Sequence, residues 1–237
     1  MSLIQKSYPS VLPIGRLVAL VAVLASLTGI DLQAAQTPSA SAIDAIFAEY
    51  DMPGSVGCAL GVSLDGELVY KKGYGFANLD WDIPITSTTA FYVGSVAKQF
   101  TAAAIALLAD EGKLDLDDDI RKYLPEMPMR DPAITIRQVV HHLSGLPGIW
   151  GVMQRNGTPT WDRFTPQQAL DLLAQQELDF PPGERYSYSN GGYFSLAMIV
   201  EAASGKSLRE YAAEKIFEPL GMTGTHFHDD PVHIISS

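Results

Sequence analysis

The stretch GSVAKQFTAAAIALLADEG, residues 94–112, decides the fold of this chain, because it places one lysine in an otherwise apolar segment of helical composition. Apart from Lys98, the segment carries no charge until Asp110. Such a composition leaves almost no polar face, so we expect a helix that is buried on most sides. A buried ammonium group is unfavourable unless it is paired or used. The position of Lys98, one helical turn after Ser95, therefore needs an explanation.

Two interpretations of this tetrad compete. In the first, Ser95 only caps the helix and Lys98 extends from its first turn to water. In the second, Ser95 is a nucleophile and Lys98 takes its proton, since residues three apart share one face of a helix. Desolvation would favour the neutral amine, which is the form that acts as a base. Chance alone yields about one S-x-x-K match in a chain of this length, so the tetrad by itself leaves both interpretations open.

Composition limits the class of protein. The chain has 237 residues, of which 47% are hydrophobic and 18% charged, as expected for a globular protein with a sizeable core. Its net charge of -11 and its lack of a basic patch argue against nucleic acid as a partner. The single cysteine, Cys58, excludes an intrachain disulfide, and its apolar surroundings (SVGCALGVSL) predict a small buried core residue.

The N-terminus has the pattern of an export signal. Lys6 and Arg16 precede the apolar run of residues 17–30, and the small-residue stretch LQAAQ follows. This pattern predicts a signal peptide over residues 1–34. We therefore expect a periplasmic or secreted protein with no stable membrane span after cleavage. The apolar run is short for a span, and an uncleaved anchor is the alternative.

Local patterns predict several elements. The segment SAIDAIFAEYDMPG indicates a short helix that ends at Pro53-Gly54, and Asp65-Gly66 indicates a hairpin between GCALGVSL and ELVYKKGYGFAN. Residues from about 112 to 182 are expected to be mainly helical. Three segments have the form of N-terminal capping boxes: residues 135–138, 165–168 and 207–210.

A second polar cluster lies in RYSYSNGGYF, residues 185–194. The flanking glycines, including Gly191-Gly192, predict a loop that presents polar side chains to a cleft. Tyr188 has a phenol that could relay protons, and Asn190 has an amide that could hold a substrate carbonyl. The alternative is that both residues only stabilise a turn before the next helix.

Together these segments resemble a known family. Ser95-Val96-Ala97-Lys98 followed far downstream by Tyr188-Ser189-Asn190 is similar to the first two motifs of the serine β-lactamase and penicillin-binding-protein family, above all class C β-lactamases and their esterase and D-amino-acid peptidase relatives. Further stretches resemble the family in the same order, from about residue 41 to about residue 230: FYVGSVAKQFTAAAIALLADEGKLDLDD, ITIRQVVHHLSGLP, PPGERYSYSNGGYFSLAMIVE and YAAEKIFEPLGMTGTHF.

The resemblance implies an α+β fold of the β-lactamase/transpeptidase type, in which helices flank an antiparallel sheet and an all-helical region is inserted between its strands. Residues 35–237 would form this serine hydrolase domain. By position, Ser95 resembles the acyl-accepting nucleophile and Lys98 its proton partner. Tyr188 resembles the tyrosine that passes the proton to the leaving group, and Asn190 the amide that binds the substrate carbonyl. The backbone N–H of Ser95 would form half of an oxyanion hole.

One motif of the family is not found in this sequence. The resemblance implies a later Lys or His followed by Thr or Ser and then Gly, and Met222-Thr223-Gly224 lacks the basic residue. We therefore expect a truncated member with its C-terminal strands missing. The expected function is a serine acyl hydrolase without a cofactor, acting on β-lactams, carboxylic esters or D-amino-acid peptides, as small-molecule or peptidoglycan-type substrates. The alternative is an inactive relic or a peptidoglycan- or ligand-binding protein.

Histidines suggest two further roles. His226, His228 and His233, with Asp229 and Asp230, have residue types that bind metals, and a metal-dependent hydrolase would use them. A surface segment without metal is the favoured interpretation of this cluster. His142, in HLSGLP, matches a family histidine at a helix end, where a structural role is expected.

Overall fold

The computed structural model describes residues 39–157 and 165–229. The chain divides into two compact units, residues 1–87 and 88–237, which we describe separately. The predicted signal peptide, residues 1–34, lies outside the described residues. Among the described residues, no helix is both long enough and apolar enough to cross a membrane.

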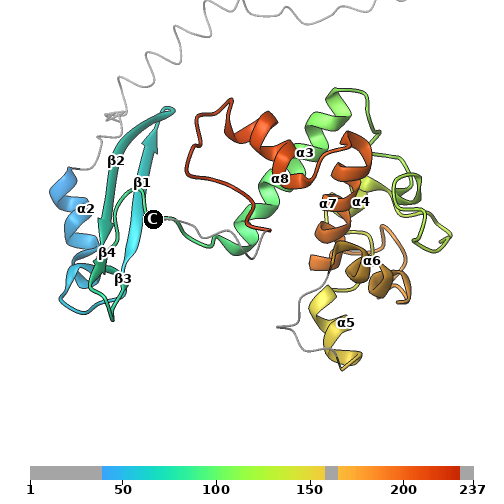
Figure 1. Ribbon diagram of the computed structural model, residues 1–237, viewed down its shortest axis with the longest axis horizontal. Helices are drawn as coiled ribbons and strands as arrows, with labels where there is room; N and C mark the ends of the chain where they lie inside the picture. Colours follow the sequence, from blue (N-terminus) through green and yellow to red (C-terminus); the bar gives the residue numbers. More distant parts are fainter. Residues whose placement is uncertain (1–38, 158–164, 230–237) are drawn as a thin grey trace, which may run out of the picture. The chain divides into compact units, whose positions relative to one another are not determined.

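The first unit is built on one hairpin. Strand β1 (Cys58–Leu64) pairs antiparallel with β2 (Glu67–Tyr74), and helix α2 (Ala40–Ile46) lies beside them, followed by the 3-10 turn η1 (Ala48–Asp51) (Figure 1). The turn residues Asp65 and Gly66 have φ angles of 51° and 84°, and a two-residue type I′ hairpin turn requires positive φ at both positions. The structure therefore confirms the predicted hairpin and the presence of a short helix, although the α-helix ends at Ile46 and not at Pro53-Gly54.

Two features of this unit differ from the sequence prediction. The predicted second hairpin strand, residues 67–78, is divided in the structure: β2 ends at Tyr74, and β3 (Phe76–Asn78) pairs antiparallel with β4 (Ile83–Pro84) instead. This second pairing was not predicted, because two or three residues are too few to show an alternating pattern. Cys58 is a free thiol and is only partly buried, so its assignment to the buried core was wrong. It is the first residue of β1, and its neighbours along that strand alternate between partly buried and exposed.

A carboxylate ties α2 to β2. Asp44 Oδ1 accepts hydrogen bonds from the hydroxyl of Tyr70 at 2.5 Å, from that of Tyr74 at 2.9 Å and from Lys72 Nζ at 2.8 Å. Tyr74 is 1% exposed, so its hydroxyl needs an internal partner. Lys72 first, and then the two phenols, lower the pKa of Asp44 to about 2. The ionised carboxylate therefore stabilises the packing of the helix on the hairpin.

We expect Asp44→Ala to lower the melting temperature at neutral pH by several degrees. Because the folded-state pKa lies below the ordinary value of 3.8, this contribution is present above about pH 4 and is lost as the pH falls through about 2. Thermal melts followed by circular dichroism should therefore converge for wild type and variant near pH 2. Asp51→Ala is the control, since Asp51 lies 4.0 Å from Lys72 and is more exposed. Equal melting of Asp44→Ala and wild type at pH 7 would contradict the prediction.

In its described residues the second unit has helices as its regular elements, and it contains the polar segments singled out in the sequence. The expectation that residues 112–182 are mainly helical was wrong, because most of the described residues of that range form turns and loops between short helices. Helices α3 (Lys98–Asp110) and α7 (Asn190–Ser204) pack against each other, with α4 (Ile136–Val140) against α7 and α8 (Leu208–Ala212) against both (Figure 1). The remaining elements are η2 (Gly94–Ala97), η3 (Ile120–Lys122), α5 (Ile149–Arg155), α6 (Pro166–Ala174) and the π-helical turn η4 (Ala213–Phe217).

The core of this unit lies between the long helices. Fully buried side chains from α3, α4, α6, α7 and α8 form one cluster, which includes Leu108, Ile136, Leu170, Leu196, Ile199 and Tyr211. All three predicted capping boxes are present, at the starts of α4, α6 and α8. In each of them the Ser or Thr side chain accepts from the third backbone N–H, and the Gln or Glu side chain accepts from the capping residue.

Helix α3 begins later than predicted. The α-helix starts at Lys98, and the preceding residues Gly94–Ala97 form a 3-10 turn. Its fully buried residues are Thr101, Ala104, Ile105 and Leu108, which lie on one face, and α3 packs against α7, α8 and η4. Most of its other residues are partly buried, and only Gln99, Ala106 and Asp110 are exposed. The structure therefore agrees with the predicted burial on most sides.

Candidate active site

Ser95 lies in the 3-10 turn η2, where its hydroxyl meets two other side chains. Its Oγ accepts a hydrogen bond from the hydroxyl of Tyr188 at 2.7 Å and lies 3.3 Å from Lys98 Nζ, which also donates to it. The N-cap of α3 is Ala97, and no side chain caps this helix. The interpretation of Ser95 as a mere helix cap is therefore wrong.

Lys98 is held from several directions. Its ammonium group donates to Asn190 Oδ1 at 2.8 Å, in addition to its contact with Ser95. It also lies over the rings of Tyr188, at 4.9 Å from the centroid, and Tyr193, at 5.6 Å. Such cation–π contacts attract an ammonium group to the faces of the two rings. Lys98 is thus half-buried and paired, and it does not simply extend to solvent.

The start of α7 carries Asn190 into this cluster. The preceding residue, Ser189, is buried and caps the helix: its Oγ accepts from the N–H of Gly192 at 3.0 Å and donates to the carbonyl of Pro147 at 3.1 Å. A Cβ on Gly191 would lie 2.3 Å from the same carbonyl, so only glycine allows this approach. Gly191 and Gly192 therefore belong to the first turn of α7, and their assignment to a loop was wrong.

The structure brings all four predicted site residues together, although 90 or more residues separate the first pair from the second. Lys98 first, and then the hydrogen bond with Ser95, lower the pKa of Tyr188 below its ordinary value of 10.0. The physical cause is the positive charge of the ammonium group, which stabilises the phenolate. The site therefore contains a hydroxyl, a phenol that ionises more readily than usual and an ammonium group in mutual contact.

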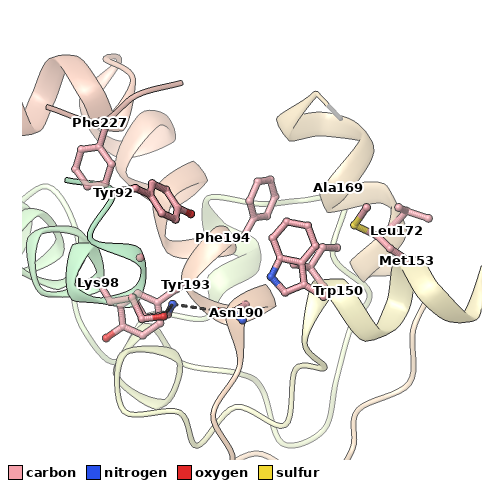
Figure 2. A pocket seen from close by; sticks show the side chains of 13 residues that line it. Tyr92, Lys98, Trp150, Met153, Ala169, Leu172, Asn190, Tyr193, Phe194 and Phe227 are labelled. Atoms are coloured by element: carbon pink, nitrogen blue, oxygen red, sulfur yellow. Dashed lines mark hydrogen bonds between the residues drawn. The ribbon is translucent and has the colours of Figure 1, made fainter. Parts of the chain in front are cut away.

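A cavity of about 600 Å³ opens beside this cluster. One side is polar and includes Ser95, Lys98 and Asn190. The opposite side, here called the apolar wall, comes from α5, α6 and α7, and Figure 2 shows Trp150 and Phe194 among the side chains that line it. Its members are Ile149, Trp150, Met153, Ala169, Leu172 and Phe194. A substrate with both a reactive carbonyl and an apolar group would fit such a cavity.

Sequence reasoning missed the apolar wall and Tyr193. Their residue types are those of any helical core, so nothing local marks them as lining a cavity. His142, expected to be structural, contacts the site directly: its ring lies 4.6 Å from that of Tyr188 and 4.9 Å from that of Tyr193. The segment HLSGLP was the one available signal for it.

The C-terminal histidines do not form a metal cluster in the described part of the chain. His226 and His228 have ring centroids 5.9 Å apart, and Asp229 pairs with Arg209 at 3.0 Å. No group of three or more metal-binding side chains occurs among the described residues. Asp230 and His233 lie outside the described residues.

Comparison with known proteins agrees with this arrangement. The Beta-lactamase family model matches residues 41–233. Penicillin-binding protein 4* of Bacillus subtilis is 34% identical over 169 residues, covering 69% of this chain and 36% of the relative. D-aminopeptidase of Brucella anthropi is 37% identical over 174 residues, covering 73% of this chain and 32% of the relative.

A solved structure of a penicillin-binding-protein homologue is also similar to this chain. The octameric penicillin-binding protein homologue from Pyrococcus abyssi matches with a TM-score of 0.65 and 35% identity, covering 77% of this chain and 42% of that one. The chain therefore belongs to the Beta-lactamase family, whose members here are penicillin-binding-protein-like serine hydrolases with the β-lactamase/transpeptidase-like fold. It spans about a third of the length of the curated relatives it matches.

Proposed function

We propose that this protein is a serine acyl hydrolase that forms an acyl-enzyme on Ser95. The observation that carries the proposal is the contact of one hydroxyl, Ser95 Oγ, with both Tyr188 at 2.7 Å and Lys98 at 3.3 Å at the edge of a cavity. A serine hydroxyl is a weak nucleophile until a neighbouring base takes its proton. Lys98 and Tyr188 are both close enough to do so.

The proton moves through the pair formed by Lys98 and Tyr188. The Lys98 ammonium group lowers the pKa of Tyr188, so this phenol loses its proton more readily than usual. Ser95 Oγ then attacks the substrate carbonyl carbon and its proton passes to the pair, with Lys98 as the proton partner. When the tetrahedral intermediate collapses, the bond to the leaving group breaks and Tyr188 delivers the proton to that group. Water repeats the sequence and releases the acid.

Asn190 and the backbone bind the substrate oxygen atoms. Because Lys98 donates to Asn190 Oδ1, the NH2 group of this amide lies on the side away from the ammonium and can donate to a substrate carbonyl. The backbone N–H of Ser95 supplies one donor of the oxyanion hole in this proposal. Such donors stabilise the charge that develops on the carbonyl oxygen in the transition state.

The names of the relatives and the cavity suggest the substrate class. D-aminopeptidase acts, by its name, on peptides with D-amino acids, and penicillin-binding protein 4* binds penicillin. We propose small-molecule or peptidoglycan-type substrates among D-amino-acid peptides, β-lactams and carboxylic esters. Hydrolysis of nitrocefin, of a p-nitrophenyl ester and of a D-alanine p-nitroanilide by the purified chain tests this, with Ser95→Ala as the reference. Reversible binding of these compounds without Ser95-dependent turnover would favour a ligand-binding protein instead.

We expect Trp150→Ala to reduce kcat/KM for a substrate with a bulky apolar acyl group by about 10-fold or more, since removing large apolar contacts in a pocket costs discrimination of this size. Trp150 lines the cavity yet is 54% exposed, so the substrate group would cover it. p-Nitrophenyl phenylacetate and p-nitrophenyl acetate are compared, and the acetate should change little. Trp81→Ala is the control, because Trp81 is 78% exposed and lies in the first unit. An equal decrease in kcat/KM for both esters would refute the proposal that the apolar wall binds the acyl group.

The proposal includes an exported location. It is supported by the signal-like pattern of residues 1–34, which predicts a periplasmic or secreted protein. Expression in a Gram-negative host followed by periplasmic extraction and mass spectrometry of the N-terminus tests it. Recovery of the chain only from the cytoplasm with residues 1–34 still attached would contradict it.

A further inference from the structure

His142 is held in an unusual backbone position next to the site. It follows the C-terminus of α4 and has a φ angle of 58°, a left-handed conformation that is uncommon for residues other than glycine. Its carbonyl accepts from the N–H of Ser187 at 2.9 Å, so the backbone of the loop before α7 is tied to it. The conformation aims the imidazole toward Tyr188 and Tyr193.

The imidazole makes one directional hydrogen bond. Its Nδ1 accepts from the backbone N–H of Ser189 at 3.1 Å. An accepting Nδ1 carries no proton, so the neutral ring has its proton on Nε2. The donor belongs to the residue between Tyr188 and Asn190, and this bond therefore fixes the backbone that carries both side chains.

The flat faces of the ring contact the tyrosines of the site. The ring of Tyr188 lies at 4.6 Å with an interplanar angle of 36°, and that of Tyr193 at 4.9 Å with 35°. Tyr186 packs edge-on at 5.8 Å. These three phenols, together with Lys98 of α3, are the titratable groups that face His142 from the loop before α7, from α7 and from α3.

We propose that His142 is a positioning residue for Tyr188 and that it acts only as the neutral imidazole. The inference rests on the proposed function, because Tyr188 must hold its hydroxyl at Ser95 for acylation. The ring provides the surface against which the phenol packs, and Nδ1 holds the backbone of Ser189. His142 itself does not touch the substrate or exchange the proton of Ser95.

Protonation would disable this arrangement. A protonated Nδ1 becomes a donor and faces the N–H of Ser189, so the bond is lost, and a second positive charge is added near Lys98. Burial first, and then the charge of Lys98, lower the pKa of His142 below its ordinary value of 6.5. The neutral form therefore prevails above that value, and positioning is lost as the pH falls through the lowered pKa.

His142→Asn tests the proposal in the full chain. Asparagine tolerates a positive φ and offers Oδ1 as an acceptor close to the position of Nδ1, but it has no ring. We expect kcat for a p-nitrophenyl ester to fall about 10-fold or more with little change in KM, and the loss of activity on the acidic side of the profile to disappear. The matched control is His141→Asn, because His141 is the adjacent residue and is exposed. The proposal would be overturned if His142→Asn had the kcat of the wild type and the same loss of activity at acidic pH.

A measurement on the wild-type chain covers the case in which His142→Asn does not fold. Nitrogen-15 NMR should show the Nε2–H tautomer for His142, assigned by substituting the other four histidines singly, with a titration midpoint that coincides with the acidic limb of acylation. The Nδ1–H tautomer, or a midpoint that differs from the acidic limb, would overturn the positioning role. If the wild-type chain shows no acylation at all, the positioning role and the proposed function fail together, whereas normal acylation with an unaffected His142→Asn refutes the positioning alone.

Discussion

Ser95→Ala is expected to abolish covalent labelling by a fluorophosphonate or β-lactam probe and to reduce turnover by at least about 10³-fold, as removal of a catalytic nucleophile does in other serine hydrolases. The physical reason is that Ser95 carries the hydroxyl shared by Lys98 and Tyr188. Intact-mass spectrometry after treatment should show one adduct on the wild-type chain and none on the variant. Peptide mapping should place that adduct on residue 95.

The control for this experiment is Ser87→Ala, which removes an exposed serine of the first unit and should leave labelling unchanged. Melting curves of both variants establish that they fold. An adduct that persists on Ser95→Ala, or maps to another serine, would refute the assignment of the nucleophile.

Tyr188→Phe is expected to slow acylation by about 10²- to 10⁴-fold, the range typical for loss of a group that transfers protons. Phenylalanine keeps the ring that packs on His142 and lies under Lys98, and it removes only the hydroxyl at 2.7 Å from Ser95. Stopped-flow measurement of the acylation rate isolates this step from deacylation. A loss confined to deacylation would show that Tyr188 does not serve the attack of Ser95.

The pH dependence gives a second readout for Tyr188. Because Lys98 lowers the pKa of Tyr188 below 10.0, the ionised fraction of Tyr188 rises with pH through that lowered value. The wild-type acylation rate should therefore rise with pH on the alkaline side, and this rise should be lost in Tyr188→Phe. Tyr186→Phe is the matched control, since Tyr186 is 64% exposed and lies two residues earlier in the same loop. A pH profile for Tyr188→Phe that parallels wild type would show that the ionisation of Tyr188 does not control acylation.

Local features of the fold were predictable because they depend on residues that lie close together in the sequence. The turn at Asp65-Gly66 and the three capping boxes each involve hydrogen bonds that span at most three residues, and all are present. The pairing of β3 with β4 was missed, because strands of two or three residues are too short to show an alternating pattern. The helical Gly191-Gly192 was read as a loop because glycine is unfavourable in helices. Gly191 lies so close to the carbonyl of Pro147 that no side chain fits there, and this contact outweighs the low helix propensity of glycine. It joins segments that are distant in the sequence, so it could not be predicted locally.

The candidate site likewise contains some residues that the sequence pointed to and others that only the packing of the helices reveals. Ser95 and Lys98 were candidates on spacing alone, since they lie three positions apart in the sequence. Tyr188 and Asn190 were candidates by residue type, and the resemblance then gave them roles. The structure places both against the first pair. The apolar wall and the contact of His142 with Tyr188 depend on how α4, α5, α6 and α7 pack. No property of those residues along the chain distinguishes them from ordinary core residues.

The hydroxyl of Ser189 has a consequence for how this site could diversify. By joining the carbonyl of Pro147 to the first turn of α7, it fastens the two ends of the segment that contains α5 and α6. Ser95, Lys98 and Asn190 lie outside that segment and Tyr188 directly precedes its second end, whereas five of the six residues of the apolar wall lie within it. We therefore expect substitutions in α5 and α6 to change the apolar wall while the four polar residues keep their mutual contacts.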